Sequence, residues 1–217
     1  MQTPRARKEQ PVPSATVPRL SGYLRQLQEI QARGTATISS RLLAEAVGTN
    51  PAQIRKDLSY FGEFGIRGVG YEVDRLINEL KKCLGLDHTW DTIIVGAGKL
   101  GTALARYRGF QKQGFNLVAM FDASRAVIGK NRGAGPVLST QELGKYLKRH
   151  HVDIAIVTTP AAVAQTIIDR VVAAGVPSIL NFAPIRAHAK KPAIVRQVDL
   201  STELMTLSFY LKKHSSH

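Results

Sequence analysis

The stretch IIVGAGKLG, residues 93–101, decides the fold of the larger part of this chain. A short β-branched run, typical of a buried strand, leads directly into the spacing Gly-x-Gly-x-x-Gly, and a helical pattern follows it. The glycine spacing alone is a weak signal, but a strand before it and a helix after it supply the context in which it binds a dinucleotide. Gly96 would permit the tight turn, Gly98 the approach of a pyrophosphate, and Gly101 the close packing of helix on strand.

Strand-like and helix-like segments alternate after residue 86. The predicted strands are Thr92–Val95, Leu117–Phe121, Ile154–Val157 and Ser178–Leu180, and the predicted helices are Leu100–Lys112, Gln141–His150 and Ala162–Ala174. Such alternation predicts an α/β fold whose parallel strands are joined by right-handed crossovers. We therefore expect a Rossmann-type doubly wound parallel sheet over residues 86–200.

The end of the second predicted strand bears on the choice of cofactor. Asp122 stands where a carboxylate accepts hydrogen bonds from the adenine ribose and repels a 2′-phosphate, so NAD(H) is favoured. Arg125 lies near enough to leave NADP(H) open, and Lys99 either contacts a phosphate or points to solvent. Ligands of parallel sheets lie at the carboxyl ends of strands, which adds two segments for the nicotinamide half. The predicted cofactor residues are Gly96, Ala97, Gly98, Lys99, Leu100, Gly101, Asp122, Thr158, Thr159, Pro160, Asn181, Phe182, Ala183 and Pro184.

An enzyme would need a substrate pocket and usually a general acid or base. None of the histidines falls in a strand-end motif, and the serines, lysines and tyrosines show no catalytic spacing. The residues after the domain boundary barely complete a nucleotide domain, and the single cysteine, Cys83, excludes an internal disulfide and a multi-cysteine metal cluster. We expect no catalytic residue and no metal site, and a sensor rather than an enzyme; a small NAD-dependent oxidoreductase is the alternative.

The net charge of +14 points to a polyanionic partner, although solvated basic faces would give the same balance. The excess is spread over both halves of the chain, so charge alone does not locate a binding face. No apolar run is long enough to span a bilayer, and the N-terminus carries no apolar signal-peptide segment. We therefore expect a cytoplasmic protein without a membrane partner.

The N-terminal part has the element order of a winged helix. After a basic, flexible tail over residues 1–17, a helix is predicted from Pro18, a second after Ser39, and a third from the cap sequence Thr49-Asn50-Pro51. A glycine-rich hairpin over 62–70 follows, and a last helix closes a domain over residues 18–85.

A winged helix places its third helix in the major groove of double-stranded DNA. Gln and Arg recognise base edges, whereas Lys and Ser commonly hold phosphates, and an arginine on the wing can enter the minor groove. The predicted DNA-binding residues are Arg19, Gln53, Arg55, Lys56, Ser59, Tyr60, Arg67 and Tyr71. An ordinary helical domain with a solvated basic helix remains the other interpretation.

Three blocks of this sequence resemble the Rex family of redox-sensing transcriptional repressors. They are AQIRKDLSYFG at 52–62 with GIRGVGY at 65–71, the glycine loop with Asp122, and NFAP at 181–184 with VDL at 198–200. The resemblance extends from about Val12 to Leu211, and its recognition-helix block is the most specific part. A nucleotide-binding subunit similar to the CoA-binding domains of ligases is a third candidate.

The resemblance implies a homodimer in which a C-terminal helix, in the segment 201–217, is swapped between subunits. NADH would bind near the dimer axis and close the subunits, which would release a palindromic operator, and genes of anaerobic or fermentative metabolism would be the usual targets. Tyr107 would lie near the nicotinamide, and Asp199 would answer an arginine or tyrosine of the partner's DNA domain, with Phe209 and Tyr210 at the same interface. Relatives usually have Tyr-Pro-Gly-Phe where this chain has Arg108 as the second residue.

Overall fold

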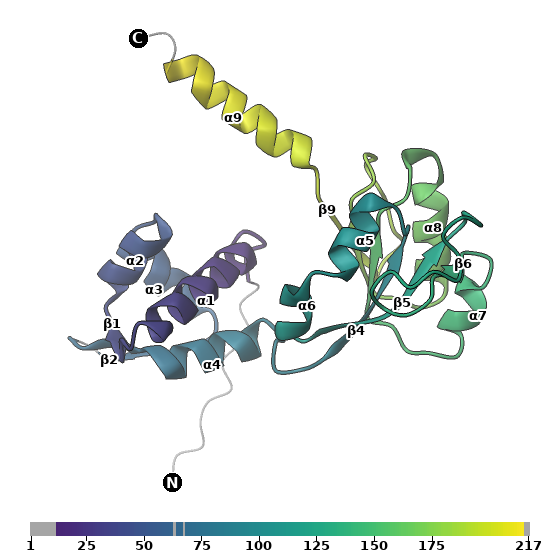
Figure 1. The fold of residues 1–217 in the computed structure, drawn as a ribbon. Helices are drawn as coiled ribbons and strands as arrows, with labels where there is room; N and C mark the ends of the chain where they lie inside the picture. The colour runs from purple at the N-terminus through teal and green to yellow at the C-terminus, as the bar shows by residue number, and fades with distance from the viewer. Residues whose placement is uncertain (1–11, 63, 67, 215–217) are drawn as a thin grey trace. The chain divides into compact units, whose positions relative to one another are not determined.

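The computed structural model describes residues 12–62, 64–66 and 68–214, and it divides the chain into two compact units, Met1–His88 and Thr89–His217 (Figure 1). Each unit has its own hydrophobic core. Each unit carries one of the two sites predicted from the sequence.

The first unit is built from the helices α1 (Thr16–Ala32), α2 (Ser40–Val47), α3 (Pro51–Ser59) and α4 (Val73–Cys83). Two side chains cap these helices as the sequence predicts. Ser39 Oγ accepts a hydrogen bond from the Leu42 amide at 3.2 Å, and Asn50 Oδ1 accepts one from the Gln53 amide at 2.8 Å. Helix α1 begins earlier than the predicted start at Pro18, because the Thr16 amide already donates to the Pro13 carbonyl.

A small antiparallel sheet completes this unit. Its strands β1 (Thr37–Ile38), β2 (Gly65–Ile66) and β3 (Gly70–Glu72) lie in the order β1-β3-β2, and the hairpin from β2 to β3 forms the wing. Gly70 has a φ of +106°, and a Cβ there would lie 2.5 Å from the Ile38 carbonyl oxygen, so the hairpin can pass β1 only with a glycine at this position. The predicted winged-helix order is confirmed.

The second unit is a parallel sheet in the order β6-β5-β4-β7-β8-β9 (Figure 1). The strands are β4 (Trp90–Val95), β5 (Phe115–Asp122), β6 (Leu138–Ser139), β7 (Ile154–Val157), β8 (Ser178–Asn181) and β9 (Ile194–Gln197). The helices are α5 (Lys99–Ala105), α6 (Arg108–Lys112), α7 (Leu143–Leu147) and α8 (Ala161–Ala173). The Rossmann-type arrangement predicted from the alternation of segments is confirmed.

Alternate residues of the strands face opposite layers of helices. Ile93 and Val95 point into the core shared with α7 and α8, whereas Ile94 points into a smaller core that includes residues of α5 and α6. Both faces of the central strand are therefore buried, which explains why residues 92–95 form an uninterrupted apolar and β-branched run.

The prediction of one continuous helix over 100–112 is wrong. The chain leaves the helical conformation at Tyr107, whose ψ of 101° is extended, and α6 starts again at Arg108. The edge strands β6 and β9 were also not predicted, because each is short and its burial does not produce a clear apolar pattern.

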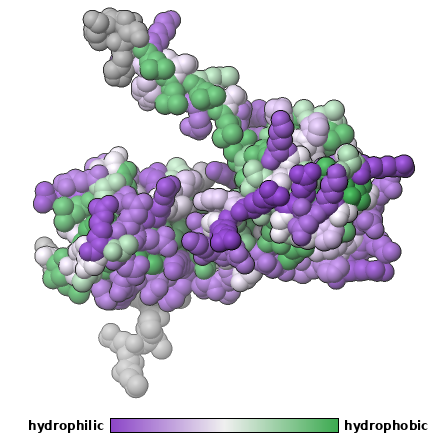
Figure 2. Space-filling model, in the orientation of Figure 1, coloured by the Kyte–Doolittle hydropathy of each residue, from purple (hydrophilic) through white to green (hydrophobic). Residues whose placement is uncertain are grey.

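A last helix, α9 (Leu200–His214), ends the described chain. Its large apolar side chains are 53–68% exposed, and Figure 2 shows them as hydrophobic surface along this helix. They are Leu200, Leu204, Met205, Leu207, Phe209, Tyr210 and Leu211. Such a surface on a helix marks an interaction site.

Adjacent leucines of α2 provide a matched test of the first core. Leu43 is fully buried, whereas Leu42 is 48% exposed. We expect Leu43→Ala to lower the free energy of unfolding of the first unit by about 2–5 kcal/mol, because it removes buried methyl groups and leaves a cavity. Leu42→Ala should cost under about 1 kcal/mol. Urea titrations followed by circular dichroism measure both, and equal losses would contradict this core.

Candidate dinucleotide site and nucleic-acid interface

The glycine loop between β4 and α5 is fixed by backbone crowding. Gly96 has a φ of +110°, and a Cβ there would lie 2.8 Å from backbone and side-chain atoms of Thr158. A Cβ on Gly101 would lie 1.9 Å from the Gly96 carbonyl oxygen, so α5 can begin this close to the strand only with a glycine at 101. Around Gly98, by contrast, an added Cβ meets nothing within 4 Å. The loop thus has two glycines that allow close packing and one that leaves open space, which is where a pyrophosphate could approach the backbone.

Asp122 is tied to this loop from the end of β5. Its Oδ2 accepts a hydrogen bond from the Ala97 amide at 2.6 Å, and its Oδ1 accepts one from the Ser124 amide at 2.8 Å. Each carboxylate oxygen has two lone pairs, so the carboxylate can still accept hydrogen bonds from ribose hydroxyls. The loop and the carboxylate therefore form one candidate site.

The end of β7 closes the site from the neighbouring strand. Thr158 Oγ1 donates to the Gly96 carbonyl at 2.8 Å, so this hydroxyl supports the loop. Thr159 Oγ1 is buried, and no hydrogen-bond partner for it is found within the described residues. A buried hydroxyl without a partner is costly, and its position at the carboxyl end of a strand fits contact with a ligand.

Asn181, which the sequence assigns to the cofactor, makes hydrogen bonds to its own loop and to β9. Its side chain is fully buried; its Oδ1 accepts from the Ala183 amide, and its Nδ2 donates to Gln197 Oε1 at 2.7 Å. The amide group therefore holds its own loop against β9, and the predicted cofactor contact of Asn181 stays a prediction. Ala183 is buried as well, whereas Pro184 is exposed.

Tyr107 lies at the junction of α5 and α6. Its ring packs edge-on against Phe110, with centroids 5.1 Å apart, and it covers Gly109 so closely that a Cβ there would lie 2.4 Å from the ring. It lines a cavity of about 540 Å³ together with Arg108, Leu104 and residues of β4, β5, β7 and β8. The glycine loop contributes no residue to the lining of this cavity, and the loop remains the candidate nucleotide site.

The interface predicted for DNA is centred on α3. Arg55 and Lys56 are exposed, and Arg55 donates to Ser40 Oγ at 3.0 Å. Ser59 Oγ donates to the Lys56 carbonyl at 2.8 Å near the end of the helix, where Tyr60 is half-buried. Gln53 is half-buried on the same helix.

Tyr71 is only 7% exposed and packs in the core of the first unit, and its predicted contact with DNA stays a prediction. Its burial follows from the glycine beside it, since a Cβ on Gly65 would lie 2.8 Å from its ring. Arg67 lies outside the described residues. Ile66 and Val69 are exposed on the wing.

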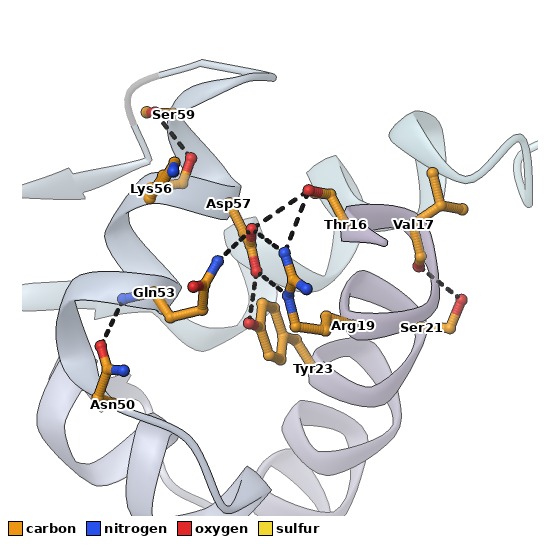
Figure 3. Close-up of polar contacts among 10 residues, drawn as sticks. All are labelled: Thr16, Val17, Arg19, Ser21, Tyr23, Asn50, Gln53, Lys56, Asp57 and Ser59. Atoms are coloured by element: carbon orange, nitrogen blue, oxygen red, sulfur yellow. Dashed lines mark hydrogen bonds and ion pairs between the residues drawn. The ribbon is translucent and has the colours of Figure 1, made fainter. Parts of the chain in front are cut away.

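Asp57, which sequence analysis missed, is the polar centre of this unit (Figure 3). It is fully buried between α1 and α3, and it accepts hydrogen bonds from Arg19 at 2.6 and 2.7 Å, from Tyr23 at 2.8 Å and from Gln53 at 2.8 Å. Thr16 Oγ1 makes a longer bond of 3.3 Å to the same carboxylate. The signal in the sequence was its position between Ile54 and Leu58, on the buried face of an otherwise basic helix.

The charges of this cluster are mutually stabilised. Burial acts to raise the pKa of Asp57, but the hydrogen bonds from Arg19, Tyr23 and Gln53 outweigh it and hold the pKa below its ordinary value. Burial and the bond to Asp57 raise the pKa of Tyr23 to about 12. The hydrogen bonds to Asp57 also raise the pKa of Arg19. Arg19, predicted to reach the DNA backbone, is in this structure the ion-pair partner of Asp57.

Asp199 stands at the start of α9. Its Oδ1 accepts hydrogen bonds from the Ser201 amide and hydroxyl, and these bonds lower the pKa of Asp199. Phe209 and Tyr210 pack edge-on further along the helix, with centroids 5.6 Å apart. The predicted role of these three residues involves a second copy of the chain and remains a prediction.

No group of histidine, cysteine and carboxylate side chains that could hold a metal occurs among residues 12–62, 64–66 and 68–214. Across the same residues, no helix has both the length and the apolar composition needed to cross a membrane.

Known families match both units. The model "CoA binding domain" matches residues 87–185, and the model "Putative DNA-binding protein N-terminus" matches residues 11–59. Among curated relatives, "Redox-sensing transcriptional repressor Rex" of Carboxydothermus hydrogenoformans is 46% identical over 202 residues, which cover 93% of this chain and 97% of that protein. The protein of the same name from Streptomyces coelicolor is 46% identical over 94% of this chain and 80% of its own length.

Solved structures extend this likeness to the whole fold. RSP in complex with beta-NAD+ and operator DNA superposes with a TM-score of 0.90 at 40% identity, covering 95% of both chains. RSP in complex with beta-NADH superposes with a TM-score of 0.88 at 39% identity, covering 95% of this chain and 97% of that one.

The buried carboxylate of Asp57 should make the stability of the first unit depend on pH. Because the folded-state pKa of Asp57 is lowered, its contribution to stability is fully present above the ordinary pKa of 3.8 and is lost as the pH falls through the folded value. Asp57→Asn should lower the free energy of unfolding of the first unit by about 3 kcal/mol at pH 7. The difference from wild type should shrink below about pH 4.

Urea unfolding between pH 7 and pH 3.5 measures this difference. Asp74, an exposed carboxylate on α4, provides the matched control, because Asp74→Asn should cost under about 1 kcal/mol at pH 7. A loss in Asp57→Asn that is small, or equal at both ends of the pH range, would contradict the assigned network.

Proposed function

This chain belongs to the Rex family of redox-sensing transcriptional repressors, and from that premise we propose that it reports the NADH/NAD+ ratio to DNA. As a homodimer it binds a palindromic operator, and NADH binding closes the dimer and releases the DNA. The observation that carries the proposal is the likeness, over 95% of the chain, to a Rex-family repressor solved both with beta-NAD+ and operator DNA and with beta-NADH.

The chain is a repressor and not an enzyme. Its curated relatives, 43–48% identical over nearly the full chain, carry the name of a repressor. A small NAD-dependent oxidoreductase is therefore not favoured. The match to a CoA-binding domain covers only residues 87–185 and reflects a shared Rossmann-type fold, whereas the full-length likeness is to a repressor solved with NAD+ and with NADH.

In the proposed site, the dinucleotide lies across the carboxyl end of the parallel sheet. The pyrophosphate lies over Gly98, where the backbone is open, and Asp122 accepts hydrogen bonds from the adenine ribose. The buried hydroxyl of Thr159 gains a partner on the ligand. Lys99 and Leu100 follow in the first turn of α5, and Phe182, Pro184 and Pro160 lie at the strand ends on the nicotinamide side.

In the proposed complex with DNA, α3 lies in the major groove. Gln53 and Arg55 contact base edges, and Lys56 and Ser59 contact phosphates. Tyr60 lies at the end of the same helix, and Arg67 on the wing reaches the minor groove. The exposed positions of Arg55 and Lys56 support these roles.

A second copy of the chain covers α9 in the proposed homodimer. The exposed apolar side chains of this helix need a partner, and exchange of the helix between subunits buries them (Figure 2). Asp199, Phe209 and Tyr210 then lie where the subunits meet, and Tyr107 senses the nicotinamide. NADH shifts the dimer toward the closed form because it binds that form more tightly than the open one. Operator DNA and NADH must share a compartment with the protein, and the compartment proposed here is the cytoplasm.

The response to NADH is the first test of this function. A fluorescent duplex, recovered from a randomised pool by binding to the protein, is titrated to saturation and then with NADH or NAD+. We expect NADH to lower the anisotropy to that of free DNA, and NAD+ to do so far less effectively. Binding that is insensitive to NADH would contradict the proposal.

The variant Asp122→Asn tests whether the NADH response can be weakened without changing DNA affinity. We expect its DNA affinity without cofactor to match wild type, while half-release needs about tenfold more NADH, because a charged hydrogen-bond acceptor for the ribose is lost. Asp169→Asn, a change at an exposed carboxylate on α8, should match wild type in both measurements. An unchanged NADH response in Asp122→Asn would remove Asp122 from the site.

Charges on α9 test the dimer. Leu204 and Leu207 are 67% and 59% exposed, so Leu204→Glu together with Leu207→Glu leaves the core of either unit intact. We expect the double variant to sediment as a monomer, because two charges cannot be buried without partners. Glu203→Lys, at a neighbouring exposed position, should remain dimeric. A dimeric double variant would contradict the role assigned to α9.

A further inference from the structure

The side-chain amide of Gln53 has its orientation imposed from inside the protein. Its Nε2 donates a hydrogen bond of 2.8 Å to Asp57 Oδ1 (Figure 3). Asp57 is held as a carboxylate by Arg19, and an ionised carboxylate only accepts hydrogen bonds. The NH₂ group of Gln53 must therefore face Asp57, and the opposite orientation would set two acceptors against each other.

The same bond determines what Gln53 presents on its other side. With Nε2 turned inward, the carbonyl oxygen Oε1 is turned away from Asp57, as Figure 3 shows. No hydrogen bond to Oε1 is found among the described residues, and the residue is half-buried, not enclosed. The side-chain amide of an unrestrained glutamine can turn either its NH₂ group or its oxygen toward a ligand. The amide of Gln53 is held so that its oxygen faces away from Asp57 and is available to accept a hydrogen bond.

The position of Gln53 on α3 would bring this oxygen to the base edges of bound DNA. Gln53 lies in the first turn of α3, where its backbone amide donates a hydrogen bond to Oδ1 of the cap residue Asn50. The amino-terminal residues of a recognition helix are those that contact base edges. In the major groove, adenine and cytosine present exocyclic amino groups, whereas guanine O6 and thymine O4 are acceptors.

We propose that Asp57 is a positioning residue for base recognition: it locks the amide of Gln53 so that Oε1 accepts from the exocyclic amino group of adenine or cytosine. Arg19, Tyr23 and Thr16 hold the carboxylate in place, so the choice of base originates in the buried cluster between α1 and α3. With adenine, the second Nε2 proton also donates a hydrogen bond to N7. With cytosine, the hydrogen bond from the exocyclic amino group to Oε1 is the only one that Gln53 makes. This inference rests on the proposed function, because it requires α3 in the major groove.

Selection from a pool of randomised duplexes tests the inference with the full-length protein. The wild type should select adenine or cytosine at one symmetry-related pair of positions. Gln53→Met keeps the length of the side chain but has no acceptor oxygen, and we expect it to lose that preference by about tenfold at this pair alone. Wild-type protein should bind duplexes in which the selected base lacks its exocyclic amino group about tenfold more weakly. The affinity of Gln53→Met should be the same for duplexes with and without that amino group. A 7-deaza purine then shows whether N7 takes part.

Asp57→Asn examines the positioning role itself. An asparagine at 57 can face Gln53 with either its oxygen or its NH₂ group, so the Gln53 amide is free to turn. We expect the preference to widen to include guanine or thymine at the same pair. Tyr23→Phe is the matched control: it removes another donor from the same carboxylate, so it should lower stability while the selected bases stay the same.

A second measurement covers the case in which Asp57→Asn does not fold. In wild-type protein without DNA, the Gln53 Nε2 proton bonded to Asp57, assigned by its absence in Gln53→Met, should exchange with solvent at least tenfold more slowly than the side-chain amide protons of Gln141, which is exposed. Exchange at the same rate would overturn the inference.

The outcomes separate the two claims. A wild type that selects no sequence contradicts both the proposed function and the inference. A wild type that selects an operator and releases it with NADH, while Gln53→Met selects the same bases, overturns the inference and leaves the function standing. A preference for guanine or thymine that depends on Gln53 also overturns it, because that amide would be presenting its donor.

Discussion

The carboxylate of Asp57 is the constraint around which the first unit is organised. A charge removed from water is tolerated only when partners surround it, and here they come from two helices: Arg19 and Tyr23 from α1, and Gln53 from α3 itself. Breaking any of these contacts leaves an incompletely paired charge in the core. The angle at which α3 crosses α1, and thus the face that α3 offers to a nucleic acid, is set by a polar contact in addition to apolar packing.

A comparable constraint shapes the second unit, but it arises from crowding instead of charge. Gly96 and Gly101 approach each other and Thr158 so closely that a methyl group at either position would collide with backbone. Asp122 then fixes the loop by accepting from the Ala97 amide. The two units therefore hold their surfaces rigid by different means: a buried ion pair for the recognition helix, and glycines with a carboxylate for the nucleotide loop.

Sequence analysis succeeded where a local pattern carries the information. Asn50 and Pro51 begin α3 as predicted, and the strand at 92–95 followed by the glycine loop gave the correct fold class. It failed where the decisive contact lies far along the chain. Arg19 meets Asp57, 38 residues away, and Asn181 meets Gln197, 16 residues away, and neither pairing leaves a periodic signal. Tyr71 looked like a surface aromatic, because its burial depends on how the hairpin folds against the helices. The contacts proposed with cofactor, DNA and a second copy of the chain involve partners outside this chain.

The account rests on coupling between two sites on one chain, and linkage gives its most direct test. If NADH weakens DNA binding, DNA must weaken NADH binding by the same factor. Calorimetry measures the affinity for NADH of the free protein and of the protein saturated with its selected duplex. The DNA-bound protein should bind NADH more weakly than the free protein, and by the same factor by which NADH lowers the affinity for DNA. Equal affinity for NADH in the two states would show that the sites are independent and would contradict the account.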